Sequence, residues 1–183
     1  MHNILALLEK LNYHTKIDCA QYNCSPLNLE IELTLLIYKK ETTMTTLYTT
    51  SATALAGRNG QVSTDDNKLN VALSYPKEMG GTGEATNPEQ LFAAGYAACF
   101  SNALLHVARE TKVAIKSAPT TSTVGIGPNE TGGFALTVTL SIELELEQQA
   151  AVELVTTAHQ VCPYSNAVRG NIDVKLIVNG VAL

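Results

Sequence analysis

The chain has 183 residues, of which 45% are hydrophobic and 16% charged, and its formal net charge at pH 7 is −5. This length fits one domain, and the composition supplies a core that a disordered chain would lack. No basic run exceeds Lys39-Lys40, and no uninterrupted apolar run approaches the roughly 20 residues that span a bilayer. We therefore expect neither nucleic acid nor a membrane as a partner.

Residues 1–43 differ in pattern from the rest of the chain. Residues 4–11 favour a short amphipathic helix and residues 29–38 a strand, with Cys19 and Cys24 in the polar stretch between them. The first apolar run is short and lacks a preceding basic region, which does not fit a secretory signal, so we expect a cytoplasmic location. We interpret residues 1–43 as an N-terminal extension and Met44 as a candidate start of a single domain over residues 44–183.

The domain opens with β patterns and then a long helix. Asn87-Pro88-Glu89 is typical of a helix start, with an Asn cap and Pro at the first helical position. The helix predicted from there to about Thr111 is apolar nearly all round as far as Val107, which is typical of a buried helix. Before it we predict strands over 48–56, 61–65 and 69–73, turns at 57–60 and 66–67, and a glycine-rich loop at 80–83.

The second half repeats the order of strands followed by a helix. Alternating apolar residues predict strands over 121–126 and 134–146, a helix follows over 148–161 until Pro163, and a last strand covers 172–178. Strands connected mostly as hairpins indicate an α+β fold, with an antiparallel sheet packed on two central helices.

Two of the four cysteines lie on the predicted central helices. Cys99 lies among alanines, where a buried structural cysteine is the commoner interpretation. Cys162 ends the second helix just before a proline, a position where the backbone can move. In a reducing compartment, retained cysteines are more often catalytic, metal-binding or buried than cross-linked. Cys99 and Cys162 are thus candidates for a reversible pair.

A reactive thiolate needs a nearby cation to lower its pKa from about 8.5. Arg58, in the turn Gly57–Gly60, is the candidate cation, and Glu89 is its candidate partner, because a bidentate carboxylate fixes a guanidinium in place. Each also has a plainer interpretation. Arg58 can be a solvated turn residue, and Glu89 an acidic first-turn residue favoured by the helix dipole.

Histidines and glycines offer weaker candidates. His106 lies seven residues after Cys99, about 10 Å along the helix, which weakens a cysteine hydrolase. His159 and Cys162 could share a metal, but no second closely spaced ligand pair accompanies them, so we expect no metal. The Gly80–Gly83 loop completes neither a dinucleotide-binding nor a P-loop pattern.

Two longer motifs carry a family resemblance. Residues 87–100 (NPEQLFAAGYAACF) and 161–172 (VCPYSNAVRGNI) closely resemble the two cysteine motifs of the organic hydroperoxide resistance branch of the OsmC/Ohr family. Residues 124–128 and 132–134 also fit, so the resemblance covers about residues 46–178. Val168 stands where threonine is expected, and residues 1–43 have no counterpart in the family.

The resemblance implies a peroxidase mechanism. Cys99 matches the peroxidatic cysteine, Cys162 the resolving cysteine, Arg58 the activating arginine and Glu89 its partner. Cys99 would become a sulfenic acid and then form a disulfide with Cys162. The family also implies an intertwined homodimer with sites at the subunit boundary. It implies no bound cofactor, and re-reduction by dihydrolipoyl groups, as on a lipoylated protein, or by another dithiol.

An apolar lining favours an alkyl or fatty-acid hydroperoxide over hydrogen peroxide, although such residues are more often core. The candidate lining residues are Leu91, Phe92, Tyr96, Phe100 and Phe134. Two other classes of function stay open at this point: a cysteine hydrolase or acyltransferase, and a non-enzymatic small-ligand or lipid-binding module with structural cysteines.

Overall fold

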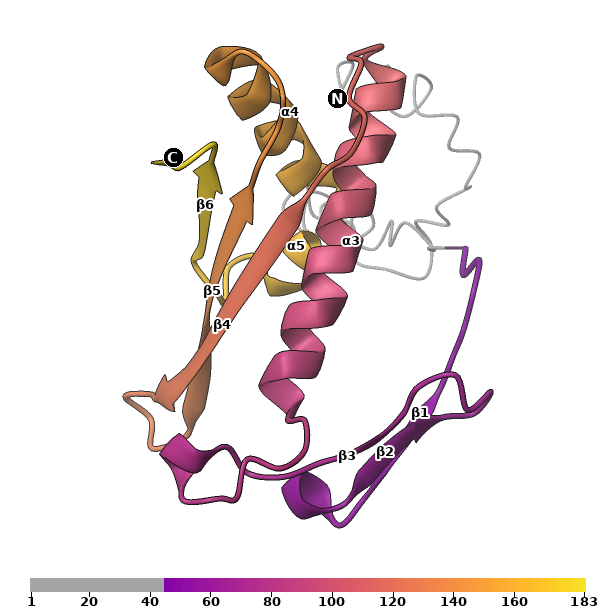
Figure 1. Cartoon of the computed structure of the whole chain (residues 1–183), viewed down its shortest axis with the longest axis vertical. Helices are drawn as coiled ribbons and strands as arrows, with labels where there is room; N and C mark the ends of the chain where they lie inside the picture. Colours follow the sequence, from indigo (N-terminus) through magenta and orange to yellow (C-terminus); the bar gives the residue numbers. More distant parts are fainter. Residues whose placement is uncertain (1–44) are drawn as a thin grey trace, which may run out of the picture. The chain divides into compact units, whose positions relative to one another are not determined.

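The computed structural model describes residues 45–183, of which Thr50–Leu183 form one compact unit. The unit contains two sheets and three α-helices (Figure 1). The elements predicted for residues 1–43, together with Cys19, Cys24 and the Met44 boundary, lie outside the described residues.

The first sheet is a short antiparallel meander of β1 (Ala52–Leu55), β2 (Gln61–Thr64) and β3 (Asn70–Ala72). Its strands match the three predicted ones but are shorter. A 3-10 turn, η1 (Gly57–Asn59), joins β1 to β2, and Ala56 before it adopts a left-handed conformation with φ of 58°. Every residue of β1 is exposed, so this sheet has little core of its own in the single chain.

The long helix α3 (Pro88–Glu110) begins where the sequence predicts. The side chain of Asn87 accepts a hydrogen bond from the backbone N–H of Gln90 at 2.9 Å, which satisfies a free amide at the helix start. The prediction of burial all round was wrong for the single chain. Tyr96, Phe100 and Leu104 are fully buried, whereas Leu105 on the other side is 38% exposed. The sheet and α4 cover only one side of the helix.

By length and composition alone, α3 could also cross a membrane. In this structure its buried side forms the protein core, where Tyr96, Phe100 and Leu104 pack with residues of the second sheet and of α4. The apolar character of the helix is therefore accounted for, on that side, by core packing.

The second sheet has the order β4-β5-β6-β7, with β4 (Thr120–Pro128), β5 (Phe134–Ile142), β6 (Val174–Val178) and β7 (Val181–Ala182). The prediction of an antiparallel sheet was wrong at one pair, because β5 and β6 run parallel. Two helices, α4 (Gln148–Val161) and α5 (Pro163–Val168), lie in the connection between these strands and return the chain to the same end of the sheet. The sequence analysis did not predict α5 or β7.

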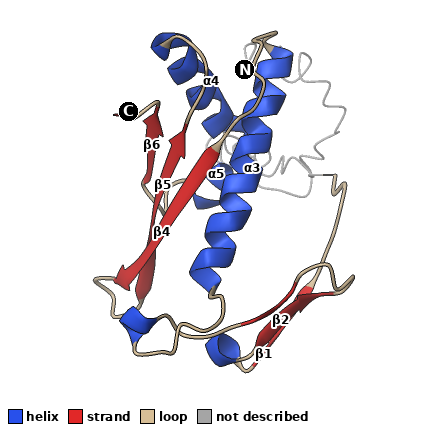
Figure 2. Ribbon diagram, viewed as in Figure 1, coloured by secondary structure: helices blue, strands red, loops and turns tan. Residues whose placement is uncertain are grey.

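The helices α3 and α4 lie side by side on one face of the second sheet (Figure 2). Val138, Leu140 and Ile142 of β5 face them and are almost completely buried. Leu154, Val155 and Ala158 of α4 complete the contact. This arrangement confirms the predicted α+β fold with two central helices.

Candidate active site

The two candidate cysteines meet where α3 passes the junction of α4 and α5. The Sγ atoms of Cys99 and Cys162 lie 3.6 Å apart, and both are free thiols. A disulfide bond measures about 2.05 Å, so the sulfurs need to approach by about 1.5 Å to bond. Cys99 is partly exposed and Cys162 is completely buried, so a solute reaches Cys99 first.

Cys162 owes its position to the proline that follows it. Its ψ of 123° takes the backbone out of the helical region, as expected for a residue before proline. Its N–H still donates to the carbonyl of Ala158 at 2.9 Å, while its carbonyl accepts from the N–H of Asn166 at 3.0 Å. One helix ends and the next begins on this residue, which turns its side chain toward α3.

Close packing of α3 against α5 holds the two cysteine segments together. The hydroxyl groups of Tyr96 and Ser165 are hydrogen-bonded at 2.9 Å, and both residues are buried. Gly95 permits the approach, because a Cβ atom there would lie 3.1 Å from the hydroxyl oxygen of Tyr164. The Tyr164 ring also packs against Phe92 and Tyr96, with centroid distances of 6.3 and 5.8 Å.

The surroundings of Cys99 in the single chain favour the neutral thiol. Burial raises the pKa of Cys99, and the adjacent sulfur of Cys162 raises it further. The backbone amide of Tyr164 acts in the opposite direction and lowers the pKa. The balance is a raised pKa, and no cation from residues 45–183 contributes to lowering it, so ionisation near neutral pH would be favoured by a cation brought from elsewhere.

Arg58 and Glu89 form the bidentate pair that the sequence predicts. Arg58 donates from Nη1 to Oε2 of Glu89 at 2.7 Å and from Nη2 to Oε1 at 2.6 Å. The hydrogen bonds to Arg58 lower the pKa of Glu89, and the same bonds raise the pKa of Arg58. The guanidinium also lies 5.8 Å from the ring centroid of Tyr75. The pair is thus charged and held in place.

The expected contact between Arg58 and Cys99 is not formed within this chain. Glu89 precedes Cys99 by ten residues on the same helix, which separates them by about 15 Å at 1.5 Å per residue. Arg58 is bound to Glu89 and makes no contribution to the pKa of Cys99. The predicted ion pair is therefore present, and the activating role of Arg58 at Cys99 stays a prediction.

The five apolar candidates do not form one lining. Tyr96 and Phe100 are fully buried in the core, whereas Leu91 and Phe92 are half-buried near the start of α3. Phe134 is 70% exposed at the start of β5, opposite Pro128 in the strand register. A substrate-binding role for these residues stays a prediction.

Neither of the two histidines within residues 45–183 forms a hydrogen bond with Cys99. His106 is exposed on α3. Burial lowers the pKa of His159, and its Nδ1 finds no hydrogen-bond partner within residues 45–183. The same range holds no cluster of three or more side chains that could bind a metal ion.

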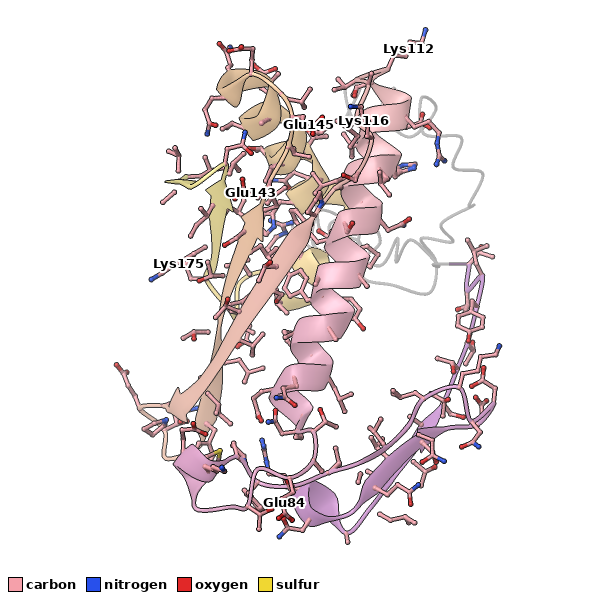
Figure 3. All side chains as sticks on the ribbon, in the orientation of Figure 1. Glu84, Lys112, Lys116, Glu143, Glu145 and Lys175 are labelled. Atoms are coloured by element: carbon pink, nitrogen blue, oxygen red, sulfur yellow. The ribbon has the colours of Figure 1, made fainter. Side chains whose placement is uncertain are left out.

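Two surface hollows lie apart from the paired thiols. One of about 460 Å³ is bordered by the α3–β4 and β5–α4 connections, where Lys116 and Glu145 approach to 3.5 Å (Figure 3). None of the predicted site residues lines it. The other, of about 330 Å³, is bordered by Asn59, Tyr75 and the loop around Gly80 and Gly81. Of its lining residues, Tyr75 has its ring centroid 5.8 Å from the guanidinium carbon of Arg58.

The hydroxyl pair of Tyr96 and Ser165 was not predicted, and Tyr96 was among the predicted site residues only as a candidate lining residue. Tyr96 lies three residues before Cys99 and Ser165 three residues after Cys162, within the two motifs noted above. Their matching offsets from the cysteines are the signal that could have drawn attention to them.

Comparisons with known proteins agree on one group of relatives. Residues 81–177 match the family described as OsmC-like protein. The organic hydroperoxide resistance protein of Xanthomonas axonopodis pv. citri is 51% identical over 133 residues, which cover 71% of this chain and 93% of that protein. The organic hydroperoxide resistance protein OhrB of Bacillus subtilis is 47% identical over 133 residues, covering 71% and 96%.

Solved structures give the same result. A Vibrio cholerae protein described as an organic hydroperoxide resistance protein, with captopril bound in one of its active sites, has a TM-score of 0.75 at 72% identity. That match covers 77% of this chain and 98% of the other. The crystal structure of Bacillus subtilis OhrB has a TM-score of 0.67 at 45% identity, covering 73% of this chain and 99% of its own.

Proposed function

The chain belongs to the OsmC family, among relatives named for organic hydroperoxide resistance, and from this premise we propose that it is a thiol-dependent peroxidase that reduces organic hydroperoxides to alcohols. The observation that carries the proposal is the 3.6 Å separation of two free thiols, one partly exposed and one buried. A structural pair of cysteines would not require this difference in access.

The first step oxidises Cys99. Its thiolate attacks the terminal oxygen of the hydroperoxide, the O–O bond breaks, and the departing alkoxide takes a proton to become the alcohol. Cys99 is left as a sulfenic acid, two electrons more oxidised. A guanidinium near the reacting oxygen would stabilise both the thiolate and the negative charge on the leaving group. We assign this role to Arg58, held by Glu89.

The second step protects Cys99 from further oxidation. The thiol of Cys162 attacks the sulfenic sulfur, an S–S bond forms, and the hydroxyl leaves with the thiol proton as water. The short distance between the sulfurs supports rapid closure. A dithiol then returns both cysteines to thiols and becomes a disulfide itself. A dihydrolipoyl group is the dithiol that we propose, and no bound cofactor is required.

We further propose that the active protein is a homodimer with sites at the subunit boundary. Two surfaces support this proposal. The three strands β1 to β3 are only three or four residues long with β1 wholly exposed, and isolated sheets of this size are marginally stable. The outer side of α3 exposes Ala94, Ala98 and Leu105. A second copy would cover these surfaces and bring the partner's Arg58 to Cys99.

The proposed substrates are alkyl or fatty-acid hydroperoxides, and the proposed location is the cytoplasm. Leu91 and Phe92 support an apolar substrate, because they are half-buried on the helix that carries Cys99. A cysteine hydrolase needs a base at Cys99, and no histidine in the described part of the chain forms a hydrogen bond with it. A binding module with structural cysteines would leave the thiols unchanged by peroxide.

The test uses the full chain with cumene hydroperoxide. We expect one equivalent to consume two free thiols and to yield a Cys99–Cys162 linkage in peptide mass analysis. Steady-state turnover should be faster with cumene hydroperoxide than with hydrogen peroxide, and faster with dihydrolipoamide than with thioredoxin as the electron donor. Thiols that survive the peroxide would refute the peroxidase and favour the binding module.

A further inference from the structure

We propose that Tyr96 and Ser165 are positioning residues for disulfide closure, and that their hydroxyl–hydroxyl hydrogen bond holds Cys162 within reach of oxidised Cys99. This inference rests on the proposed peroxidase function. It assigns the pair to the second step of the reaction and not to the first.

The hydroxyl pair lies next to the sulfur pair and joins the same two segments. Tyr96 is three residues before Cys99, almost one helical turn, and Ser165 is three residues after Cys162. The oxygen atoms are 2.9 Å apart and the sulfur atoms 3.6 Å. Within residues 45–183 this is the only oxygen–oxygen hydrogen bond between side chains of α3 and α5. A displacement of the segment from Cys162 to Ser165 away from α3 would break this bond and also separate the sulfurs.

The Cys162 segment needs such an anchor. The helix α5 has six residues, and a helix this short depends on tertiary contacts for its placement. Its first residue is proline, which donates no backbone hydrogen bond, and Cys162 before it is outside the helical conformation. The chain can therefore pivot at the residue that carries the resolving sulfur.

The hydroxyl bond is a directional contact between side chains of α3 and α5. The ring of Tyr164 contacts Phe92 and Tyr96 with tilted planes, a geometry that tolerates sliding. The bond between Tyr96 and Ser165 does not tolerate it, because Tyr96 is 0% and Ser165 1% exposed. Water cannot easily replace a lost partner there. Burial also raises the pKa of Tyr96, so its hydroxyl keeps the proton at the pH where a thiolate reacts.

The two reaction steps should therefore respond differently to the loss of the bond. Peroxide attack on Cys99 does not require the two sulfurs to approach, and it depends on α5 only through the Tyr164 amide that lowers the pKa of Cys99. Disulfide closure requires the sulfurs to approach by about 1.5 Å, and it competes with a second peroxide that converts the sulfenic acid to a sulfinic acid. A looser α5 should slow closure and shift this competition toward the sulfinic acid.

The experiment compares Ser165→Ala, Tyr96→Phe and their double variant with the wild-type chain. Ser101→Ala is the matched control, because Ser101 is also on α3 and its hydroxyl donates to the carbonyl of Ala118 at 2.7 Å, away from α5. Rapid mixing with one equivalent of cumene hydroperoxide gives the rate of sulfenic acid formation and the rate of disulfide closure. Intact mass after excess peroxide gives the ratio of sulfinic acid to disulfide.

We expect closure to slow roughly threefold to tenfold in each single variant, the range that corresponds to one hydrogen bond. The sulfinic-to-disulfide ratio should rise by the same factor, because the two reactions compete. Sulfenic acid formation should slow by a smaller factor than closure, because a looser α5 weakens only the Tyr164 amide contact that lowers the pKa of Cys99. The double variant should be no slower than the slower single variant, because both substitutions remove one shared bond. Ser101→Ala should behave like wild type.

Unchanged closure in Tyr96→Phe, which keeps the ring and the core volume, would overturn the proposal. An equal slowing in Ser101→Ala would also overturn it, because general loosening of α3 would then explain the effect. If the wild-type chain itself forms no Cys99–Cys162 disulfide, the peroxidase function fails. If the wild-type chain forms the disulfide and the variants form it at the same rate, the positioning role fails while the peroxidase function stands.

Discussion

The inactive variant Cys99→Ser and the variant Arg58→Ala, which should be weakly active at neutral pH, should restore activity when they share a dimer. Cys99→Ser removes the attacking sulfur, and Arg58→Ala removes the guanidinium proposed to activate it. In one chain, Glu89, which binds Arg58, is ten residues from Cys99 along α3, or about 15 Å. This separation is several times the length of a hydrogen bond, and it is the reason why we propose that Arg58 acts on the Cys99 of another chain.

The magnitude follows from counting sites. A heterodimer of the two variants has one site with both groups intact and one site with neither, so it should retain about half of the wild-type turnover per dimer. Each variant homodimer retains no intact site. The assay coexpresses the two chains with different affinity tags, purifies the doubly tagged dimer, and measures cumene hydroperoxide reduction with dihydrolipoamide.

The opposite result is equally clear. If Arg58 activates the Cys99 of its own chain, every site in the heterodimer lacks one of the two groups and activity stays at the level of the homodimers. A heterodimer of wild type with the double variant Cys99→Ser/Arg58→Ala is the control. It should be inactive when Arg58 acts across the boundary and half-active when it acts within one chain.

Three further outcomes are expected. Cys162→Ser should complete one peroxide reduction and then accumulate sulfinic acid on Cys99, which adds the mass of two oxygen atoms to the chain. Multiple turnovers without this mass increase would show that Cys162 is not the resolving cysteine. Arg58→Ala should move the acid limb of the kcat/KM profile to higher pH by about 1–3 units, because burial raises the pKa of Cys99 and the cation proposed to lower that pKa is lost. A profile unchanged in shape would place Arg58 outside the site. Gly95→Ala should lower the free energy of unfolding by about 1–3 kcal/mol, because the added Cβ would lie 3.1 Å from the Tyr164 hydroxyl oxygen. An unchanged thermal unfolding temperature would show that α5 can move away from the added methyl group without loss of stability.

Local chemistry in the sequence determined the helices closely. Asn87-Pro88 sets the start of α3, since the Asn side chain caps an amide that the helix leaves free and Pro needs no such bond. Pro163 sets the end of α4 for the same kind of local reason. The bidentate match between a guanidinium and a carboxylate likewise made Arg58 and Glu89 a recognisable pair.

Contacts between distant segments were decided only by the tertiary structure. The parallel pairing of β5 with β6 depends on the path of the crossover through α4 and α5, which alternating residues within a strand do not encode. The Tyr96–Ser165 bond joins residues 69 positions apart. The position of Arg58 relative to Cys99 is also a property of the fold. The sequence indicates that Arg58 and Glu89 can pair, but it does not indicate how far from Cys99 the folded chain places this pair. Sequence patterns reflect short-range conformational preferences, whereas the meeting of two sulfurs depends on how the whole core packs.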